Sequence, residues 1–427
     1  MAGNRKKIAV VGLGYVGLPL ALLCEKKGYE VFGVVKTKKS AESLNRKHTS
    51  IVDKDIVKSL KRSKIHVDFQ FSKIKESSII VICVPTPVTK NFSPDFRPLI
   101  NAAKKIGKNL QKKQLVILES TVNPGVSEEI VIPILEKESG LICGKDFYYA
   151  YCPERINPGD TKWTVEIIPR VVGAAEKKSL SLAFTFYKSI LTASVMKMDS
   201  LKEAEAVKIV ENSFRDINIA FVNELAKSFS LLGIDIEHVL NGASTKPFSF
   251  LRHNPGIGVG GHCIPVDPYY LIKSMKKKGF SHKLLSTARL INNSMPSYAI
   301  QLLEEKLLKS GKTINDVKVG ILGVSYKPNI NDTRESPFFN LFNSLKKKKT
   351  DIAIYDPYVP ELSTHKSLSD FLKTSDVIIL TTAHHEFLSL TEKKLAENNV
   401  KIIIDGRNCL NKENFKAGKV LYKGIGR

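Results

Sequence analysis

The chain has 427 residues, which is too long for one ordinary domain at roughly 150 residues each and predicts two or three. Its 43% hydrophobic and 25% charged residues exclude a disordered, collagen-like or disulfide-stapled protein. Its 66 Lys and Arg against 42 Asp and Glu leave a formal charge of +24. This excess favours anionic partners, which could be nucleic acid, an anionic membrane or phosphorylated small molecules.

No apolar run reaches the roughly 18 residues that a membrane span needs, so we expect no membrane insertion. The amino terminus leads directly into an apolar strand and a glycine-rich turn, which does not fit a signal peptide. The six cysteines are scattered without CxxC pairs, so they fit neither a zinc site nor a disulfide framework. We therefore expect a cytoplasmic location, no metal, and one or more cysteines available for chemistry.

Short apolar runs rich in β-branched residues alternate with helical patterns near both ends of the chain. The first series is 7–11, 30–34, 79–83 and 115–118, and the second is 317–322, 351–355, 377–380 and 401–404. Such alternation is typical of βαβ units in parallel sheets. The sequence therefore predicts an α/β fold with two Rossmann-like parallel-sheet domains that flank a different central region.

The central region begins with 201–232, which contains neither Pro nor Gly and repeats apolar residues at helical spacing. This pattern predicts one long helix that ends near Gly233. A second apolar face on the helix favours a homodimer contact, and a buried connector is the alternative. The expected domains are 1–198, which binds a dinucleotide, 199–312, which is helical, and 313–427, which is again Rossmann-like.

The stretch from Gly12 to Gly17 reads GLGYVG, follows the first strand and opens a helix. In this context GxGxxG indicates a dinucleotide site. Gly12 permits the tight turn, Gly14 lets the backbone approach a pyrophosphate, and Gly17 lets helix and strand pack closely. The helix N-terminus then offers N–H groups to the anion. Glycines that serve packing alone are the alternative.

The second strand ends without the carboxylate that usually binds the adenosine ribose. Val35 stands where that Asp is expected, and Lys36, Lys38 and Lys39 follow. Loss of the acid together with added lysines is the change that accommodates a 2′-phosphate, so NADP is possible. The alternative is a solvated lysine loop in a chain that still uses NAD.

A second glycine-rich loop, residues 258–268, contains Cys263 and then Asp267. Exposed backbone amides beside a cysteine favour its thiolate and make it a candidate nucleophile, whereas a small buried cysteine is the alternative. On the long helix, Lys208 and Asn212 share one face at i, i+4, although a solvated face would also explain them. Further polar loops, 121–125 and 152–157, follow strands of the first domain, where ligands bind in this architecture.

Six stretches carry a resemblance to a known family: GLGYVG, STVNPG, CPERINPG, EAVKIVENSFRDINIAFVNELA, GVGGHCIPVDP and GVSYKPNINDTRESP. Together they resemble the UDP-sugar 6-dehydrogenases over nearly the whole chain. Residues 245–248, His262 before the cysteine and residues 265–270 are similar to the branch that oxidises UDP-N-acetylhexosamines. The UDP-glucose enzymes typically have Ser before the Cys and Lys just before the Asp.

The resemblance implies a four-electron oxidation of a primary alcohol to a carboxylate with two NAD molecules per turnover. Cys263 would capture the aldehyde as a thiohemiacetal and later form a thioester. Lys208 and Asn212 would stabilise the oxyanion, and Asp267 would handle protons and position water. Glu154 and Thr121 would assist proton transfer and hydrolysis.

The same resemblance implies the binding residues and assigns the UDP portion to the carboxyl-terminal domain. The implied cofactor residues are Gly12, Gly14, Tyr15, Val16, Gly17, Val35, Lys36, Pro85, Thr86, Thr121 and Arg334. The implied substrate residues are Glu154, Arg155, Lys208, Asn212, Arg252, Gly260 and Lys327. Arg407, after the last predicted strand, is expected to reach the active cleft. The product would be a precursor for surface polysaccharide or another glycan.

Three alternatives stay open. One is a UDP-glucose 6-dehydrogenase, and another is a two-electron hydroxyacid or 6-phosphogluconate-type dehydrogenase on a related scaffold. The third is a nucleic-acid-binding protein, to which the lysine runs 276–278 and 346–349 point. These runs lack interleaved aromatic residues and fit solvated helix ends better, so we expect no nucleic-acid partner. Within the N-acetylhexosamine branch the epimer is open, with UDP-GlcNAc placed before UDP-ManNAc.

Overall fold

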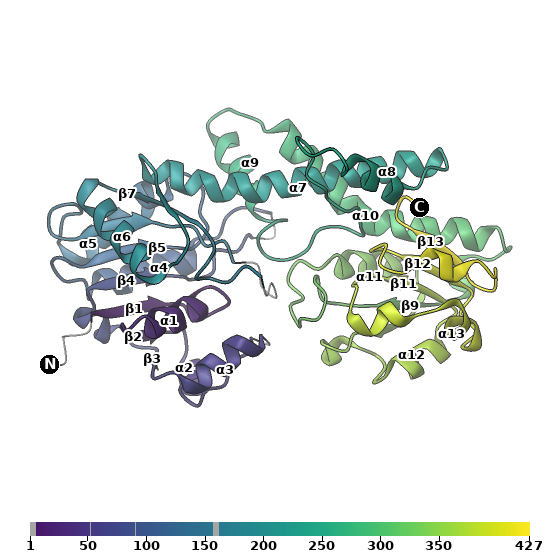
Figure 1. Ribbon diagram of the computed structural model, residues 1–427, viewed down its shortest axis with the longest axis horizontal. Helices are drawn as coiled ribbons and strands as arrows, with labels where there is room; N and C mark the ends of the chain where they lie inside the picture. Colours follow the sequence, from purple (N-terminus) through teal and green to yellow (C-terminus); the bar gives the residue numbers. More distant parts are fainter. Residues whose placement is uncertain (1–5, 52, 90, 157–161) are drawn as a thin grey trace. The chain divides into compact units, whose positions relative to one another are not determined.

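The computed structural model describes residues 6–51, 53–89, 91–156 and 162–427. The chain forms two compact units (Figure 1). The first unit consists of Met1–Glu211 with Tyr269–Lys277, and the second of Asn212–Pro268 with Lys278–Arg427. Each unit contains one sheet, so the predicted α/β fold with two sheet domains and a helical region is confirmed.

The sheet of the first unit has the order β3-β2-β1-β4-β5-β6-β7-β8. Its strands are β1 (Lys7–Val11), β2 (Glu30–Val34), β3 (His66–Asp68), β4 (Ile79–Ile82), β5 (Leu115–Leu118), β6 (Tyr148–Tyr151), β7 (Arg170–Ala174) and β8 (Val195–Lys197). All described pairings are parallel except that of β6 with β7. The four predicted strands are present, whereas β3, β6, β7 and β8 were not predicted from the sequence.

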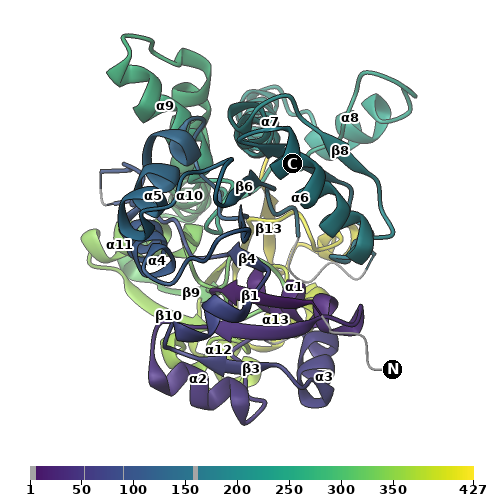
Figure 2. The same cartoon turned by 90° about the vertical axis from the view of Figure 1, so that its left-hand side faces the viewer.

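Helices cover both faces of this sheet, because alternate residues of each strand point to opposite faces. The helices are α1 (Gly17–Lys26), α2 (Lys38–Asn45), α3 (Lys54–Arg62), α4 (Arg97–Gly107), α5 (Ile132–Ser139) and α6 (Lys177–Ile190). On β1, Ile8 and Val10 pack with α1 and α6, whereas Ala9 and Val11 pack with α4 and α5. Figure 2 shows α4 and α5 on one side of the strands and α6 on the other.

The sheet of the second unit has the order β10-β9-β11-β12-β13, and all its described pairings are parallel. Its strands and helices are β9 (Lys318–Leu322), β10 (Asp351–Tyr355), β11 (Val377–Leu380), β12 (Ile402–Asp405), β13 (Leu421–Gly424), α11 (Pro337–Lys347), α12 (Leu368–Thr374) and α13 (Glu392–Glu397). The four predicted strands are confirmed, with β9 and β12 beginning one residue later than expected. β13 was missed, because its short run is only half-buried.

Helix α7 (Leu201–Leu231) is the predicted long helix and has 31 residues (Figure 1). It ends as expected at Gly233, whose φ of +69° lies in the left-handed region. There the Ile234 N–H donates to the Phe229 carbonyl at 2.9 Å. Helices α8 (Ile236–Ala243) and α10 (Lys283–Leu308) contribute to the same core as the carboxyl-terminal part of α7 and one face of the second sheet.

Both lysine runs occur at helix ends, as the solvated interpretation predicted. Lys276 and Lys277 lie in the last turn of α9 (Asp267–Lys277), and Lys346 and Lys347 in that of α11. Ammonium groups there complement the helix dipole. The remaining short helical turns are η1 (Ser72–Glu76), η2 (Ser127–Val131), η3 (Ile314–Asp316), η4 (Pro360–Leu362), η5 (His385–Ser389) and η6 (Lys412–Phe415).

Two kinds of feature are absent from the described ranges. No helix there combines the length and the apolar composition needed to cross a bilayer. Within the same ranges, no three His, Cys, Asp or Glu side chains are arranged to hold a metal ion. All six cysteines lie in these ranges, and none forms a disulfide.

Candidate active site

The glycine turn after β1 has the geometry that a pyrophosphate requires. A Cβ on Gly12 would lie 2.6 Å from the Cys83 carbonyl oxygen, and a Cβ on Gly17 would lie 1.9 Å from the Gly12 carbonyl oxygen. Both positions therefore exclude any side chain. A Cβ on Gly14, by contrast, would meet no heavy atom of the described residues within 4 Å. The turn is thus tightly packed at Gly12 and Gly17 and open at Gly14, just before the N-terminus of α1. This arrangement fits a dinucleotide phosphate.

The loops after β4 and β5 are joined at the carboxyl edge of the first sheet. The Thr86 hydroxyl donates to the Thr121 carbonyl at 2.7 Å, and the Ser120 hydroxyl donates to the Val84 carbonyl at 2.7 Å. The structure therefore brings together Thr86 and Thr121, two of the cofactor residues that the resemblance implied, and Pro85 precedes Thr86 in the chain. Tyr15, Val16 and Val35 are partly buried against the adjacent core.

A buried carboxylate that the sequence analysis missed holds the Thr121 loop to α7. Glu205 accepts the Gly125 N–H at 2.6 Å and the Ser127 N–H at 2.9 Å. Burial raises the pKa of Glu205, although these hydrogen bonds oppose the shift. Glu205 lies at i, i+3 from Lys208, which is also buried, so the loop and Lys208 are positioned by one stretch of helix.

Glu154 and Arg155 lie just beyond β6. The Glu154 carboxylate accepts the N–H of Arg155 at 2.6 Å and the N–H of Ile156 at 2.5 Å. Arg155 forms an ion pair with Glu211 of α7 and donates to the Pro169 carbonyl at 2.8 Å. Asn157, the last residue of the predicted 152–157 loop, lies outside the described residues.

In the second unit, the Cys263 loop packs against the segment that follows β9. The Gly261 N–H donates to the Arg334 carbonyl at 3.0 Å, and a Cβ on Gly260 would lie 2.5 Å from Cβ of Tyr326. Cys263 is partly exposed, with Sγ 3.5 Å from Nε2 of His262. Glycine is therefore required where the loop meets Tyr326, which explains the glycine-rich sequence.

The loop turns directly into α9 and places Asp267 at the first residue of that helix. The Asp267 N–H donates to the Cys263 carbonyl at 2.8 Å. The Asp267 carboxylate accepts a hydrogen bond from the side-chain amide of Asn212, and both side chains are buried, at 2% and 7% exposure. Two predicted catalytic residues thus contact each other, and Lys208 lies one turn before Asn212 on α7.

A second buried network supports the start of the same loop. Asn223 of α7 accepts the Gly256 N–H at 2.8 Å and donates to Asn292 of α10 at 2.9 Å. Asn292 in turn donates to the Asp216 carboxylate at 2.8 Å, to which Arg289 also donates at 2.6 Å. These residues were not assigned from the sequence, because polar residues on a helix do not reveal which of them face inward.

The other predicted basic residues of this unit have definite partners. Arg334 forms a two-point contact with the Asp332 carboxylate, at 2.9 and 2.5 Å. This contact and the nearby Cys263 raise the pKa of the Arg334 guanidinium. Arg252 pairs with Glu237 at 2.6 Å, and Arg407 donates to carbonyl groups of Thr381 at 2.7 Å and Gly258 at 3.4 Å. Lys327 lies in the loop after β9, partly buried.

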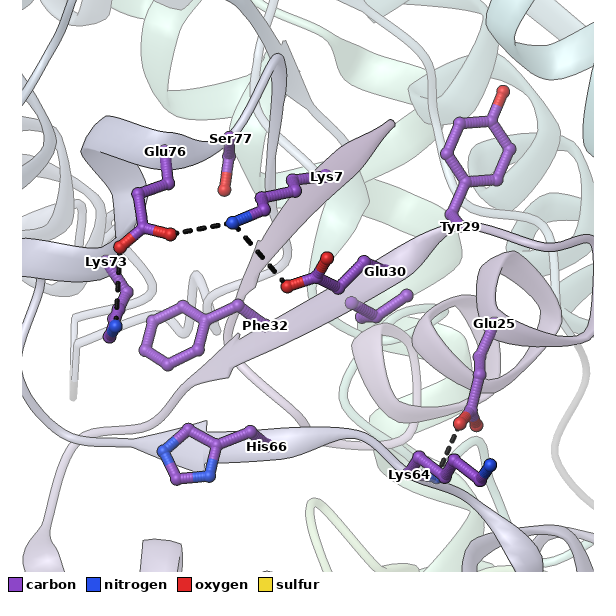
Figure 3. Close-up of a pocket in the computed structure, with 11 residues that line it drawn as sticks. Lys7, Glu25, Tyr29, Glu30, Phe32, Lys64, His66, Lys73, Glu76 and Ser77 are labelled. Atoms are coloured by element: carbon purple, nitrogen blue, oxygen red, sulfur yellow. Dashed lines mark hydrogen bonds and ion pairs between the residues drawn. The ribbon is translucent and has the colours of Figure 1, made fainter. Parts of the chain in front are cut away.

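A cavity of about 310 Å³ lies at the amino-terminal ends of β1, β2 and β3 (Figure 3). Lys7 pairs there with Glu76 at 2.8 Å and Glu30 at 3.7 Å, and the Phe32 ring stacks on His66. The glycine turn lies at the opposite, carboxyl-terminal end of β1. This cavity is therefore separate from the dinucleotide site, and its Lys7 and Lys73 are paired with acidic side chains.

The glycine turn, with its open position at Gly14, gives the first unit the features of a dinucleotide-binding domain. The chain belongs to the UDP-glucose/GDP-mannose dehydrogenase family. The NAD binding domain of that family matches residues 6–191, its central domain residues 202–294 and its UDP binding domain residues 320–412. The protein is thus an NAD-binding nucleotide-sugar dehydrogenase, and the predicted family is confirmed.

Individual relatives are similar along nearly the whole chain. UDP-N-acetyl-D-glucosamine 6-dehydrogenase of Pseudomonas aeruginosa is 37% identical over 90% of this chain and 92% of its own length. The structure of UDP-D-ManNAc dehydrogenase from Pyrococcus horikoshii has a TM-score of 0.92 at 35% identity, with 99% of each chain covered. An NDP-N-acetyl-D-galactosaminuronic acid dehydrogenase from Methanosarcina mazei has a TM-score of 0.85 at 32% identity, covering 100% of this chain and 96% of the other.

Proposed function

We propose that the protein oxidises the C6 hydroxyl of a UDP-N-acetylhexosamine to the carboxylate of the uronic acid, with UDP-GlcNAc as the first candidate and UDP-ManNAc as the second. Relatives named for N-acetylated sugars, at 32–37% identity, support this substrate class over UDP-glucose. The observation that carries the mechanism is the connection of Cys263 through its carbonyl to Asp267, whose carboxylate is bonded to Asn212.

NAD held at the glycine turn would supply the hydride acceptor for both oxidations, and the open position at Gly14 fits its pyrophosphate. In the chain's own part of the reaction, the Cys263 sulfur adds to the aldehyde carbon to form a thiohemiacetal. Oxidation converts this adduct into a thioester, and water releases the carboxylate and regenerates the thiol. Covalent capture keeps the aldehyde from escaping between the two oxidations.

Buried polar residues would supply the charge that these steps need. The Lys208 ammonium and the Asn212 amide lie on adjacent turns of α7 and would stabilise the developing oxyanion. Asp267, held by Asn212, would position the hydrolytic water and accept its proton. We assign Glu154 and Thr121 to proton transfer and hydrolysis as well.

The remaining substrate contacts are assigned to Arg155, Arg252, Gly260 and Lys327, with Lys327 on the diphosphate and Arg334 on the cofactor. A side-by-side assay of UDP-GlcNAc, UDP-ManNAc, UDP-GalNAc and UDP-glucose tests the substrate proposal. We expect kcat/KM for an N-acetylated sugar to exceed that for UDP-glucose by at least about tenfold. Equal or higher efficiency with UDP-glucose would reject the N-acetylhexosamine assignment and favour UDP-glucose 6-dehydrogenase.

For the cofactor we propose two NAD molecules per turnover, and NADP is the second candidate. Val35 follows β2 where a ribose-binding carboxylate is expected, and Lys36, Lys38 and Lys39 are exposed beside it. Kinetics with both cofactors decide between them, with Val35→Asp as the informative variant. If NADP is used, Val35→Asp should lower its kcat/KM by about tenfold or more and spare NAD, because the new carboxylate repels the 2′-phosphate. A large preference of the wild-type protein for NAD would reject NADP.

We also propose that the protein forms a homodimer. An exposed apolar stripe on α7, with Val210 at 60%, Phe214 at 48% and Phe221 at 53% exposure, supports a homodimer through this helix.

Six cysteines without a disulfide support a reducing, cytoplasmic location. We retain the division into domains 1–198, 199–312 and 313–427, and a role in making precursors of surface polysaccharide or other glycans.

A further inference from the structure

Behind Glu154, the first unit buries two carboxylates beside one guanidinium. Glu119 directly follows β5, Glu154 follows β6, and Arg170 is the first residue of β7. Their side chains are 0%, 7% and 0% exposed, respectively. Strands β6 and β7 are antiparallel, with Ala150 opposite Ala174. Continuing this register sets Glu154 opposite Arg170, so the sheet itself places the two side chains together.

The contacts within this cluster are unequal. Arg170 donates to the Glu154 carboxylate at 2.6 Å and to the Pro153 carbonyl at 3.0 Å. Its distance to the Glu119 carboxylate is 3.8 Å, which is too long for a hydrogen bond. Glu119 instead accepts the Tyr187 hydroxyl at 2.6 Å, and its second oxygen has no hydrogen-bond partner among the described residues. Of the two carboxylates, the Arg170 guanidinium therefore forms its hydrogen bond with Glu154.

The charges explain why the contact of Arg170 with Glu119 is the weaker of the two. Two ionised carboxylates beside one guanidinium would leave a net negative charge in a site without solvent, which is costly. Burial raises the pKa of Glu119 to about 7, with Arg170 opposing the shift and Glu154 adding to it. Glu119 therefore holds a proton on the acid side of neutrality and loses it as the pH rises.

Apart from Arg170 and Glu154, the titratable groups that face Glu119 do not ionise in this range. They are Cys24 of α1, Cys83 after β4, Cys152 after β6 and Tyr187 of α6. Burial raises the pKa of all four, so each stays neutral around pH 7. The change of charge beside Arg170 near neutrality is thus attributable to Glu119.

We propose that Arg170 and Glu119 are positioning residues for Glu154: Arg170 orients the Glu154 carboxylate while Glu119 is protonated, and is drawn toward Glu119 when that residue ionises. The rate then responds to pH through a buried group that does not touch the substrate. This inference rests on the proposed role of Glu154 in proton transfer.

The test compares Glu119→Gln with the full-length wild-type protein, because glutamine has the shape of a protonated glutamate. kcat/KM is measured from about pH 5.5 to 9 with NAD and the best of the four UDP-sugars, and the ratio of variant to wild type removes ionisations common to both. We expect a ratio near one at the acid end that rises to roughly 3–10 at the alkaline end. A ratio that is constant or falls with pH overturns the proposal.

Two further variants separate the possible failures. Tyr187→Phe removes a hydrogen bond that favours the charged form of Glu119. The pH at which ionisation of Glu119 lowers kcat/KM should therefore rise by roughly half a unit to one pH unit. A pH profile of kcat/KM that does not move contradicts the proposal, even if Glu119→Gln fails to fold. Glu154→Gln should lose about a hundredfold or more of the rate at every pH. Wild-type activity of Glu154→Gln would reject the role of Glu154 itself, whereas an inactive Glu154→Gln with a flat Glu119→Gln ratio rejects the positioning role alone.

Discussion

The side-chain amide of Asn212 on α7 donates a hydrogen bond to the carboxylate of Asp267 at the first residue of α9, and both side chains are buried. The two residues are far apart in sequence, and the glycine-rich loop that carries Cys263 brings them together. A buried carboxylate that accepts a hydrogen bond from an amide has a restricted orientation, and a carboxylate can act as a proton acceptor. This contact is the centre of the proposed site.

Asp267→Asn should lower kcat by about 10²–10⁴-fold with a much smaller change in KM, because the amide can hold the same place but cannot accept a proton. Steady-state kinetics with the preferred UDP-sugar measure both constants. Asn218→Ala is the matched control on α7, since its amide donates to the Phe214 carbonyl within its own helix, and it should retain wild-type rates. An Asp267→Asn protein with near-normal kcat would remove Asp267 from proton transfer.

The two glycines at the turn should fail in different ways. Gly14→Ala places a methyl group where no described protein atom lies within 4 Å, so thermal stability should be unchanged while KM for NAD rises by about tenfold or more. Gly17→Ala forces a methyl group into the Gly12 carbonyl and should cost several kcal/mol of unfolding free energy, on the order of 2–4. Thermal melts with and without NAD distinguish them. A Gly14→Ala protein that binds NAD normally would contradict the assigned phosphate position.

Asn223→Ala should affect both the stability and the rate. The substitution leaves the Gly256 N–H and the Asn292 amide without their shared partner in a buried position, which costs about 1–3 kcal/mol. Because Gly256 begins the segment that leads to Cys263, kcat should fall as well. Urea unfolding and steady-state kinetics test both effects, with Asn223→Asp as a variant that keeps the acceptor. Full activity of Asn223→Ala would show that the loop holds its geometry without this support.

The second unit should carry an acid-sensitive contact at Asp356. Burial raises the pKa of this carboxyl, but hydrogen bonds from His384 and from the N–H groups of Ser325 and Val324 outweigh burial and hold the pKa below its usual value. The folded state therefore favours the charged form. Its stabilisation is fully present above the usual carboxyl range and is lost as the pH falls through the lowered pKa.

Asp356→Asn should accordingly reduce the unfolding free energy by about 1–3 kcal/mol at neutral pH, and the difference from wild type should shrink below about pH 4. Denaturant unfolding at several pH values provides the measurement. A difference that stays constant on acidification would mean that the variant acts through lost packing rather than lost charge.

The sequence predicted the elements whose pattern is local. Strands such as β1 and β9 are continuous apolar runs, and the α7 pattern ends at a glycine, so each was identified correctly. Strand β7 was missed because its first residue is a fully buried arginine, which no hydrophobic pattern predicts. Its charge is balanced by Glu154 and Glu119, which follow two other strands.

The site residues likewise divide into those with a local sequence pattern and those that depend on the tertiary fold. Cys263, Asp267 and the glycines were proposed from the sequence because their loops have a distinctive composition, and the structure places Asn212 in contact with Asp267. Glu205 and Asn223 were given no role from the sequence, although Glu205 bonds the predicted 121–125 loop and Asn223 bonds Gly256, just before the predicted 258–268 loop. On a helix such residues look like ordinary surface residues until the tertiary fold shows which side is buried.

The most direct test of the proposed chemistry is the amount of NADH formed per molecule of UDP-N-acetylhexosamine consumed. Both amounts are measured in the same reaction, NADH by its absorbance and the sugar product by direct quantification. The proposed mechanism predicts a ratio of two for the wild-type protein, with the uronic acid as the only product, and loss of complete turnover in Cys263→Ala. A ratio of one, or a Cys263→Ala protein that still forms two NADH per sugar, would contradict it.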